Sequence, residues 1–588
     1  MKQFFKFMFA SCLGSALMLT IALILLIWTI GSSTSDTVSA KPKTVLYMNL
    51  DYVIPERTTK DDIIGLLMGL RNDINADLSG MNDIIANIDA AKNDPNISGI
   101  FMELSTIGTS MANIEEIRNH LFSFRESGKF VITYSDVLGQ NAYYLATAGD
   151  EIYLNPEGML DIHGMSAQVM FYKNLLDKLD IEIQIVRGPN NKFKSAVEPY
   201  FLDKMSEANR EQMSNLLNTV WFKVVSDINA TRGISIDRIN TLADDLALTF
   251  DAEVALEEGF VDGLVYRDEI IARIKGLAGI DKSKKINILN NVQYASVRPE
   301  AKVKADKIAL IYANGEIIDG DGDDETIGSI TLSKAIREAR ENKKVKAIVM
   351  RVNSPGGSAL ASDVIRREVE LAKAEKPFIV SMGNYAASGG YMISAGSDYI
   401  FADPTTLTGS IGVFGVFPNA KKFLNETLGL TFDVVKTNEN ADFGRINEPL
   451  TKYQKAMLQK YVGNTYDDFT ALVARTRGLR QSYVDSIGQG RVWAGADAVE
   501  LGLVDELGGL DKAIEYAAKQ AHLTDYSIKD YPKQTDLMDM IMKGSMPEPY
   551  TKSTLKKKFG IYYNYIESAE RISRINGIQA LMPFMIVE

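Results

Sequence analysis

The sequence predicts an α/β fold of two tandem domains that arose by internal duplication and that follow one transmembrane helix. From residue 45 onward, short apolar runs alternate with amphipathic segments, which is typical of βαβ units. The same order of segments then occurs a second time along the chain. An uncharged, mostly apolar stretch precedes both copies. Together these three observations predict the fold class.

The uncharged stretch runs from Phe7 to Ile30. Its length of about 24 residues, at about 1.5 Å per residue, is enough to cross the core of a bilayer. Lys2 and Lys6 precede it, so the positive-inside rule places the N-terminus in the cytoplasm and the rest of the chain on the extracytoplasmic, periplasmic side. The apolar region of a cleaved signal peptide is usually only about 7 to 15 residues long. We therefore expect an uncleaved, single-pass anchor in the cytoplasmic (inner) membrane.

The composition excludes several classes of function. A net charge of −12 over 588 residues argues against a nucleic-acid partner, because phosphate binding needs a basic surface. The single cysteine, Cys12, excludes an intrachain disulfide. The three histidines (His120, His163 and His522) lack the spacing of a metal site and offer few candidates for a Ser-His-Asp triad. We expect no metal and no cofactor.

The order of elements is clearest at the start of the first copy. Helical spacing at 83–92 and at 114–124 alternates with strand-like runs at 97–104 and at 130–134. Strands that alternate with helices in this way predict a mainly parallel sheet covered by helices.

The repeat is visible in two pairs of segments. Residues 334–354 have the layout of residues 86–106, and residues 391–406 have that of residues 143–158. The offset stays near about 247 or 248 residues, which indicates a duplication.

The duplication divides the chain into two related domains joined by a polar, lysine-rich linker. The apolar end of the chain leaves open a membrane-surface contact, a subunit contact or packing against its own domain. The predicted divisions are a cytoplasmic N-terminus (1–6), the anchor (7–30), a tether (31–44), the first domain (45–275), the linker (276–305), the second domain (306–525) and a C-terminal extension (526–588).

Ser388 lies in an Ala-Ala-Ser-Gly-Gly sequence that follows the apolar run 377–382. The run, the turn-forming Gly383 and Asn384, and the Ala-rich residues after them predict a strand, a tight turn and the start of a helix. Free N–H groups at a helix start would stabilise a serine oxyanion or an acyl intermediate. The alternative is a Gly-rich packing turn whose hydroxyl does no chemistry.

A comparison of the two copies favours the first interpretation. At an offset of 247, Ser388 falls on Asn141, which has no hydroxyl (388 − 247 = 141). The turn Asn353–Gly357 falls near residues 104–108, which keep one glycine where the second copy has a pair. The second copy is therefore the candidate owner of a nucleophile.

A lysine shows the opposite distribution. Glu198-Pro199 matches Glu448-Pro449, and this register places Lys194 on Gly444. A lone lysine is most often a solvated surface charge. The first copy has the lysine but no matching serine, and the second copy has the serine but no matching lysine. This distribution predicts a single site shared by the two copies.

These residues resemble the signal peptide peptidases A of the long, duplicated type. Those enzymes are membrane-anchored serine proteases of the Clp protease/crotonase-like superfamily. Asn-Ser-Pro-Gly-Gly alone is shared by several relatives, whereas all four motifs in this order are highly specific. The motifs are Lys-Ser-Ala-Val-Glu-Pro (194–199), Asn-Ser-Pro-Gly-Gly (353–357), Tyr-Ala-Ala-Ser-Gly-Gly-Tyr (385–391) and Leu-Thr-Gly-Ser-Ile-Gly (407–412).

The resemblance implies a Ser-Lys dyad in which Ser388 is the nucleophile and Lys194 the general base. A lysine with an ordinary pKa of about 10.4 must be desolvated to act as a base near pH 7. Glu198 would keep the ammonium charged if it paired with Lys194, so we expect it to point elsewhere. Ser410 matches a family serine that hydrogen-bonds the lysine, although a plain turn serine remains the alternative.

The resemblance also implies an oxyanion hole, a class of substrate and an oligomeric state. Backbone N–H groups of Gly356 and Gly357, at the start of an apparent helix, and of Gly389 are candidates for the oxyanion hole, and two of the three would suffice. The implied substrates are remnant signal peptides, and the implied assembly is a homo-tetramer at the membrane. Two other functions stay open, namely a crotonase-type acyl-CoA enzyme and a catalytically idle membrane scaffold.

Overall fold

The computed structural model describes residues 38–58, 79–188, 190–299, 303–323, 325–534, 577–583 and 586–587, and the isolated residues 14, 18 and 21. The predicted cytoplasmic N-terminus and nearly all of the predicted anchor lie outside these residues. Within the described ranges, no helix is both long enough and apolar enough to cross a membrane.

The first half of the chain builds a fully parallel six-stranded sheet in the order β7-β4-β3-β2-β1-β8. The last of these strands, β8, lies inside the segment predicted as a linker. The strands are β1 (Thr44–Met48), β2 (Ile97–Glu103), β3 (Phe130–Gly139), β4 (Glu151–Asp161), β7 (Gly263–Leu264) and β8 (Ile288–Asn290). The helices are α3 (Met81–Asn93), α4 (Met111–Arg125), α5 (Gln140–Ala146), α6 (Lys173–Lys178), α7 (Glu207–Arg232), α8 (Ile236–Asp244), α9 (Ala252–Glu257), α10 (Arg267–Leu277) and α11 (Asn291–Ala295), and a 3-10 helix, η1, spans Ser195–Tyr200.

The periodicity of the first copy is confirmed by these elements. The predicted helices at 83–92 and 114–124 are α3 and α4, and the predicted strands at 97–104 and 130–134 are β2 and β3. Apolar residues recur on the helix faces that meet the sheet, so Ile84, Ile88 and Ile114 are completely buried in one core.

The second half has a similar sheet in the order β18-β16-β14-β12-β9-β20, to which β15 and β19 are attached. Its strands pair in parallel except that β18 is antiparallel to β16. Its strands are β9 (Lys307–Asn314), β12 (Val345–Ser354), β14 (Phe378–Ala387), β15 (Tyr399–Ala402), β16 (Leu407–Gly409), β18 (Val492–Ala494), β19 (Glu506–Leu507) and β20 (Ser527–Tyr531). Its helices are α12 (Ser329–Glu341), α13 (Ala359–Lys373), α14 (Gly389–Ser394), α15 (Lys452–Arg477), α16 (Gln481–Ile487), α17 (Gly495–Glu500) and α18 (Leu510–Gln520), and a short π-helix, η2, spans Phe423–Thr427.

A third sheet, in the order β11-β10-β13-β21-β17-β6, joins the two halves. β6 comes from the first half and pairs antiparallel with β17 of the second, while β21 comes from the end of the chain. Its strands are β6 (Glu182–Arg187), β10 (Glu316–Ile318), β11 (Thr326–Gly328), β13 (Gly356–Ser358), β17 (Phe414–Asn419) and β21 (Gly577–Leu581); a separate pair consists of β5 (Ala167–Gln168) and β22 (Ile586–Val587).

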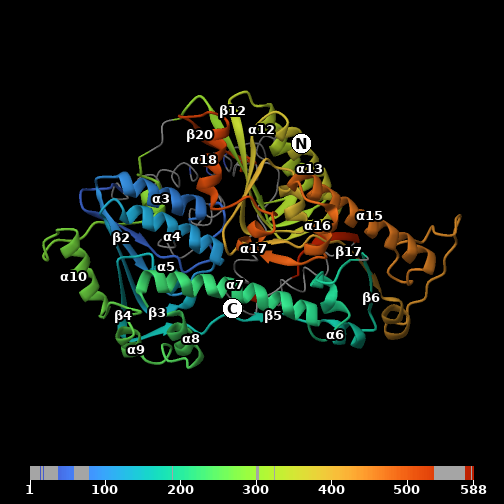
Figure 1. The fold of residues 1–588 in the computed structure, drawn as a ribbon, viewed down its shortest axis with the longest axis horizontal. Coiled ribbons are helices and arrows are strands. Elements are labelled where there is room, and N and C mark those ends of the chain that lie inside the picture. Colours follow the sequence, from blue (N-terminus) through green and yellow to red (C-terminus); the bar gives the residue numbers. More distant parts are fainter. Residues whose placement is uncertain are drawn as a thin grey trace.

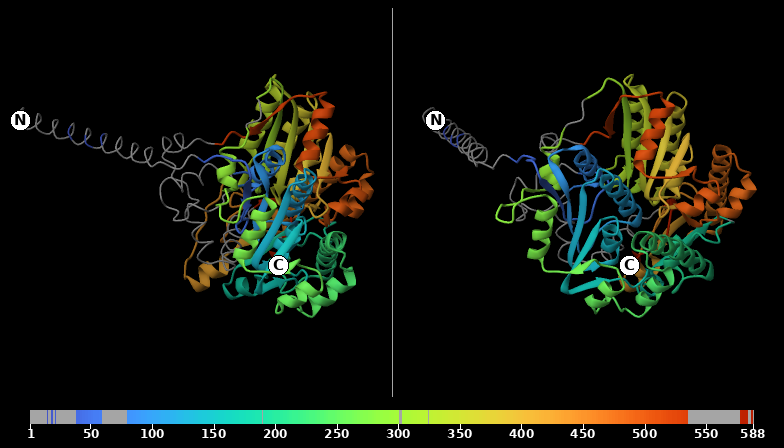
Figure 2. Two further views of the ribbon diagram at one scale, coloured as in Figure 1. Left: turned by 90° about the vertical axis from the view of Figure 1, so that its left-hand side faces the viewer. Right: turned by 60° about the vertical axis from the view of Figure 1, so that its left-hand side comes forward.

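The duplication is visible in matched hydrogen bonds as well as in topology. Arg232 bonds Gly259 O and Asp262 in the first half, and Arg477 bonds Gly502 O and Asp505 in the second. Each arginine thus ties the end of a long helix to the edge of its own sheet. The two halves lie side by side in Figures 1 and 2, and α7 runs along the lower side of Figure 1.

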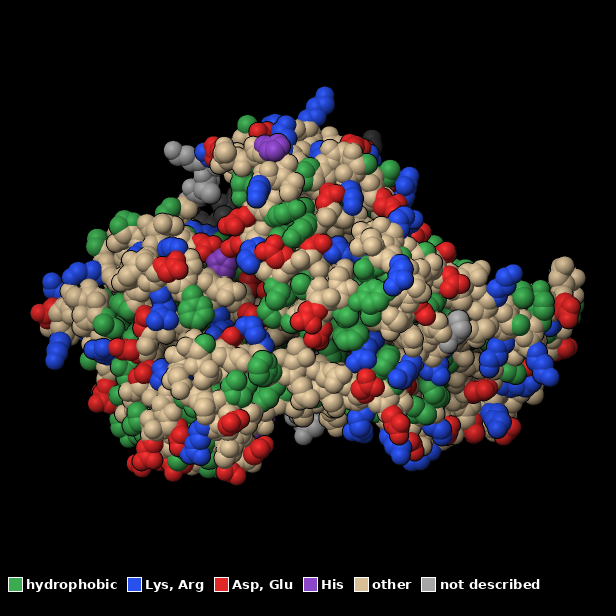
Figure 3. Space-filling view, in the orientation of Figure 1, with side chains coloured by type: hydrophobic (Ala, Val, Ile, Leu, Met, Phe, Trp, Pro, Cys, Tyr) green, Lys and Arg blue, Asp and Glu red, His purple; other side chains and the backbone are tan. Residues whose placement is uncertain are grey.

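Buried charges hold the halves together. Arg351 on β12 is 1% exposed and binds Glu56 and Glu116 of the first half at 3.0 and 2.7 Å. His120 on α4 lies between Asp89 and Asp511, at 2.8 and 2.9 Å. On the outer face shown in Figure 3, acidic and basic side chains are intermixed.

Candidate active site

Ser388 sits between the end of β14 at Ala387 and the start of α14 at Gly389. Its φ of 56° and ψ of −111° are sparsely populated for a residue with a side chain, and this strain persists only where the surroundings impose it. The backbone N–H of Ser388 donates to Gly409 O at 2.8 Å, and its carbonyl accepts from Met392 N at 2.8 Å. The two neighbouring elements therefore fix the position of the hydroxyl.

The helix start predicted at Ser388 is confirmed, but the turn predicted at Gly383 and Asn384 is wrong. β14 resumes its pairing at Ala386, with Ser354 on one side and Thr408 on the other, and runs to Ala387; its register against β12 shifts between Met382 and Ala386, so Gly383 and Asn384 lie at an irregularity within the strand. Pairing with two neighbouring strands outweighs the local turn preference of Gly-Asn.

Lys194 reaches the same place from the first half. It directly precedes η1, and the N–H of its neighbour Phe193 donates to Gln489 O of the second half at 3.0 Å. A carbon atom added to Gly490 would lie 2.4 Å from Lys194 Cβ, and one added to Gly412 would lie 3.2 Å from its Cδ. Two glycines of the second half thus make room for the lysine stem, and Lys194 is only 1% exposed.

The structure brings Lys194, Ser388 and Ser410 together. Lys194 Nζ lies 2.8 Å from Ser388 Oγ, 2.9 Å from Ser410 O and 3.0 Å from Ser410 Oγ. A neutral amine has two N–H bonds and one lone pair. The two Ser410 oxygens accept the two N–H bonds, which leaves the lone pair directed at the hydroxyl of Ser388.

Electrostatics favour the neutral form of this lysine. Burial holds the pKa of Lys194 well below its ordinary value of 10.5, because a charged ammonium would lose its hydration there. Glu198 does not counteract this effect. It accepts hydrogen bonds from Ser206 and Asn209 at the start of α7, so the expectation that it serves the fold is confirmed.

Two of the three candidate glycines, Gly356 and Gly389, approach the same carbonyl oxygen. Gly356 and Gly357 have φ of 100° and 152° and form part of β13, which precedes α13, so they do not lie at the helix start as expected. A carbon added to Gly356 would lie 2.0 Å from Ala580 O and 2.8 Å from the amide nitrogen of Gly389. One added to Gly389 would lie 3.1 Å from the same oxygen. A peptide carbonyl from the end of the chain therefore lies between Gly356 and Gly389.

Three contributors to the site escaped sequence reasoning. Gly412 and Gly490 enclose Lys194, and β21 lies over the glycines. Gly412 belongs to the Leu-Thr-Gly-Ser-Ile-Gly motif, and its place in that motif could have marked it as a residue of the site. For Gly490 and β21 the only signals were a Gly-Gln-Gly sequence and an apolar run, neither of which indicates a partner in space.

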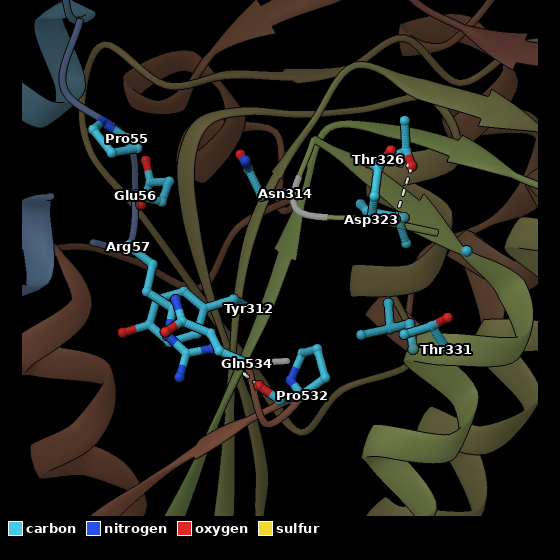
Figure 4. Close-up of a pocket in the computed structure, with 13 residues that line it drawn as sticks. Pro55, Glu56, Arg57, Tyr312, Asn314, Asp323, Thr326, Thr331, Pro532 and Gln534 are labelled. Atoms are coloured by element: carbon cyan, nitrogen blue, oxygen red, sulfur yellow. Dashed lines mark hydrogen bonds between the residues drawn. The ribbon is translucent and has the colours of Figure 1, made fainter. Parts of the chain in front are cut away.

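One pocket lies away from this site, between the halves (Figure 4). Pro55, Arg57 and Tyr312 are among the residues that line it, and the guanidinium of Arg57 lies 5.1 Å from the centre of the Tyr312 ring. Neither Lys194 nor Ser388 lines this pocket, so it is separate from the cluster that these two residues form with Ser410.

Comparison with known proteins agrees with this geometry. The family model described as Peptidase family S49 matches residues 123–281 and 370–524, one range in each half. The chain is 38% identical to "Protease 4" of Salmonella typhi over 78% of this chain and 75% of that protein, and 37% identical to "Protease 4" of Haemophilus influenzae over 76% and 74%. It is 32% identical to the "Putative signal peptide peptidase SppA" of Enterococcus faecium over 47% of this chain and 83% of that one.

The two family matches start 247 residues apart (370 − 123), which is the offset of the internal repeat. Both halves are thus versions of one protease domain. The chain belongs to peptidase family S49 and is a serine protease.

Proposed function

We propose that this protein is a membrane-anchored endopeptidase in which Ser388 is the nucleophile and Lys194 the general base. The observation that carries the proposal is the distance of 2.8 Å between Lys194 Nζ and Ser388 Oγ at a fully buried lysine. A serine hydroxyl is a weak nucleophile until a base takes its proton. A lysine kept neutral by burial supplies that base, and Ser410 directs its lone pair.

The mechanism follows from these positions. Nζ of Lys194 takes the hydroxyl proton as Oγ of Ser388 attacks the substrate carbonyl carbon, and the tetrahedral intermediate collapses when the leaving amine takes that proton. Water, activated in turn by Lys194, then hydrolyses the acyl-enzyme. Backbone N–H groups of Gly356, Gly357 and Gly389 are the proposed oxyanion hole. The carbonyl oxygen of Ala580 lies near Gly356 and Gly389, and the N–H of Gly356 also donates to Ser354 Oγ at 3.2 Å.

The proposal extends to the setting of the reaction. Residues 7–30 anchor the chain in the cytoplasmic membrane, and both protease domains (45–275 and 306–525) lie on its extracytoplasmic side. The enzyme degrades cleaved signal peptides, as the name of the Enterococcus faecium relative suggests, and acts as a homo-tetramer. The apolar stretch, the positive-inside rule and the family resemblance support these points.

The test uses the full chain in detergent and a synthetic signal peptide as substrate. Ser388→Ala and Lys194→Ala are each expected to lower kcat/KM by at least about 10³-fold, because each removes one member of a unit that acts together. Lys192→Ala is the matched control, since Lys192 is exposed two residues away and should change the rate by less than about twofold. Undiminished cleavage by either dyad variant would overturn the proposal.

A further inference from the structure

Lys194 lies at the apex of a tight turn of the backbone. Its φ of −76° and ψ of 76° are close to those of the central residue of an inverse γ-turn, and the N–H of Ser195 donates to Phe193 O at 2.8 Å. A single hydrogen bond closes a turn of this kind. Other contacts therefore have to fix the direction in which the turn points the Lys194 side chain.

Gln212 on α7 binds both residues that flank Lys194. Its Nε2 donates to Phe193 O at 3.1 Å and to Ser195 Oγ at 2.9 Å, and Gln212 is only 1% exposed. A carbonyl oxygen can only accept, so the nitrogen of the amide has to face Phe193. Gln212 thus closes the turn a second time, from a neighbouring helix.

The oxygen of the same amide reaches the second half of the chain. Gln212 Oε1 accepts from the N–H of Val492 on β18 at 3.3 Å. Val492 pairs with Gly409 on β16, and Gly409 O accepts from the N–H of Ser388 at 2.8 Å. One side chain therefore links the turn that carries the lysine to the strands that hold the serine.

Glu198 completes the network around this glutamine. Gln212 Nε2 also donates to Asn209 Oδ1 at 3.0 Å, and Asn209 Nδ2 donates to Glu198 at 3.1 Å. All three residues are buried. A buried polar network in which every member has partners is rigid, because breaking any of its bonds leaves a costly unpaired group. The rotamer of Gln212 is therefore fixed at both ends of its amide.

The second copy lacks this glutamine as well as the lysine. α7 and α15 are equivalent helices of 26 residues, and each ends before a glycine with a positive φ, Gly233 and Gly478. These glycines are 245 residues apart (478 − 233), so Gln212 corresponds to Met457 (212 + 245), which is 46% exposed. The helix itself does not require a buried amide at this position, and the amide occurs in the copy that has the lysine.

We propose that Gln212 is a positioning residue for the reaction, which holds the turn at Lys194 so that Nζ faces Ser388 Oγ. The inference rests on the proposed function of Ser388 and Lys194. The amide exchanges no proton in the reaction, so Gln212 acts only through the position of the lysine. Its loss should therefore slow the chemical step and leave the binding of the peptide unchanged.

The test measures kcat and KM of the full chain in detergent, with a synthetic signal peptide as substrate. Gln212→Met keeps the length of the side chain and removes its hydrogen bonds. It is expected to lower kcat by about 10- to 100-fold and to change KM by less than about twofold, because a misplacement of about 1 Å has effects of this order on the chemical step. Gln454→Met is the matched control. Gln454 is also a buried glutamine near the start of a long helix, bonded to Asn440, and its variant should keep the wild-type kcat.

A second measurement distinguishes positioning from a general loss of structure. In a Lys194→Ala background, adding Gln212→Met should change the residual rate of Ser388 acylation by an activated ester by less than about twofold, because residues that act as a unit are not additive. A further loss of about tenfold in that background would overturn the inference, since Gln212 would then act without the lysine.

A milder variant decides the question if Gln212→Met does not fold. Ser195→Ala removes one acceptor of the Gln212 amide and should lower kcat by about two- to tenfold, the range expected for one hydrogen bond. An unchanged kcat in this variant would contradict the inference.

The outcomes also separate this inference from the function on which it rests. If Ser388→Ala and Lys194→Ala abolish cleavage while Gln212→Met keeps the wild-type kcat, the inference is wrong and the function stands. If Ser388→Ala cleaves as fast as wild type, the proposed function fails as well. A raised KM with an unchanged kcat would assign Gln212 to peptide binding and would also overturn the inference.

Discussion

The two halves of the molecule have the same sheet order at their centres and differ at the end of one strand. In the second half, β14 ends in Ser388 with a φ of 56°, whereas in the first half β3 ends at Gly139 with a φ of −72° and leads directly into α5. Between residues 130 and 162 of the first half, all of them described, no residue has a positive φ. The strained backbone that presents a hydroxyl therefore exists in one copy only.

The matched tyrosines show which residue replaces the serine. Tyr143 donates to Phe260 O at 3.0 Å, and Tyr391 donates to Leu503 O at 2.8 Å, so these two tyrosines are equivalent. Ser388 lies three residues before Tyr391, and Gln140 lies three residues before Tyr143. The equivalent residue is thus Gln140, one position from the Asn141 that the offset of 247 indicated.

Gln140 explains what the first half does instead. Its side chain donates to Gly164 O and accepts from the N–H groups of His163 and Gly164. The position that carries the Ser388 hydroxyl in one copy thus holds the loop at residues 163 and 164 in the other. In the proposed mechanism the two copies therefore contribute different groups, with Lys194 in the first half and Ser388 with its neighbouring glycines in the second.

The largest expected effect comes from replacing Lys194 with a side chain that cannot accept a proton. Lys194→Arg should lower kcat/KM by at least about 10³-fold, because a guanidinium stays protonated and accepts no proton. Lys192→Arg is the matched control. In the wild-type enzyme, the rate should fall as the pH drops through a pKa well below 10.5, which a pH–rate profile measures. An acidic limb near 10.5 would contradict a desolvated base.

A smaller effect should come from the second-half glycine that makes room for the lysine. Gly490→Ala places a carbon 2.4 Å from Lys194 Cβ and should lower kcat by about 10- to 100-fold, because a misplacement of about 1 Å has effects of this order. Gly478→Ala is the matched control. Both glycines have a positive φ, but the added carbon at Gly478 meets nothing within 4 Å. Equal losses in the two variants would show that backbone strain alone is responsible.

The burial of Lys194 should also lower the stability of the folded protein. A lysine whose pKa is lowered in the folded state binds fewer protons there than in the unfolded state. Its burial therefore lowers the free energy of unfolding below about pH 10.5, and this loss disappears above that pH. Lys194→Met should therefore raise Tm at pH 7 by at least about 1 °C, with a difference that shrinks towards pH 10.5. Calorimetry on both proteins measures this, and a lower Tm at neutral pH would contradict it.

The smallest expected effect concerns the contact between the halves at His120. Burial acts to lower its pKa, but hydrogen bonds and charges from Asp511 and Asp89 outweigh burial and raise the pKa to about 10. The stabilisation should be complete below pH 6.5 and lost as the pH rises to about 10. His120→Asn should lower the free energy of unfolding at pH 6 by about 1.5–3 kcal/mol and by much less at pH 10. A loss independent of pH would contradict it.

Much of the fold and of the candidate site could be predicted from the sequence, because the duplication allows one copy to be compared with the other. The alternation of elements in residues 83–134 follows local periodicity, and Ser388 and Lys194 stood out because each lacks a counterpart in the other copy. What could not be predicted depends on distant contacts. β14 continues beyond Gly383 because both neighbouring strands pair with it again at Ala386, and β21 pairs with strands that lie more than 150 residues away in sequence.

Arg351 limits how a duplicated protein of this kind can evolve. Its guanidinium belongs to one half and its two glutamates to the other, all buried. Breaking a buried ion pair by removing one partner costs about 3–5 kcal/mol. Either copy on its own would therefore lack the partners of this ion-pair cluster and would hold only one of Lys194 and Ser388. Once the copies had come to share this arginine, returning to a single-domain gene would have required reversing several substitutions together.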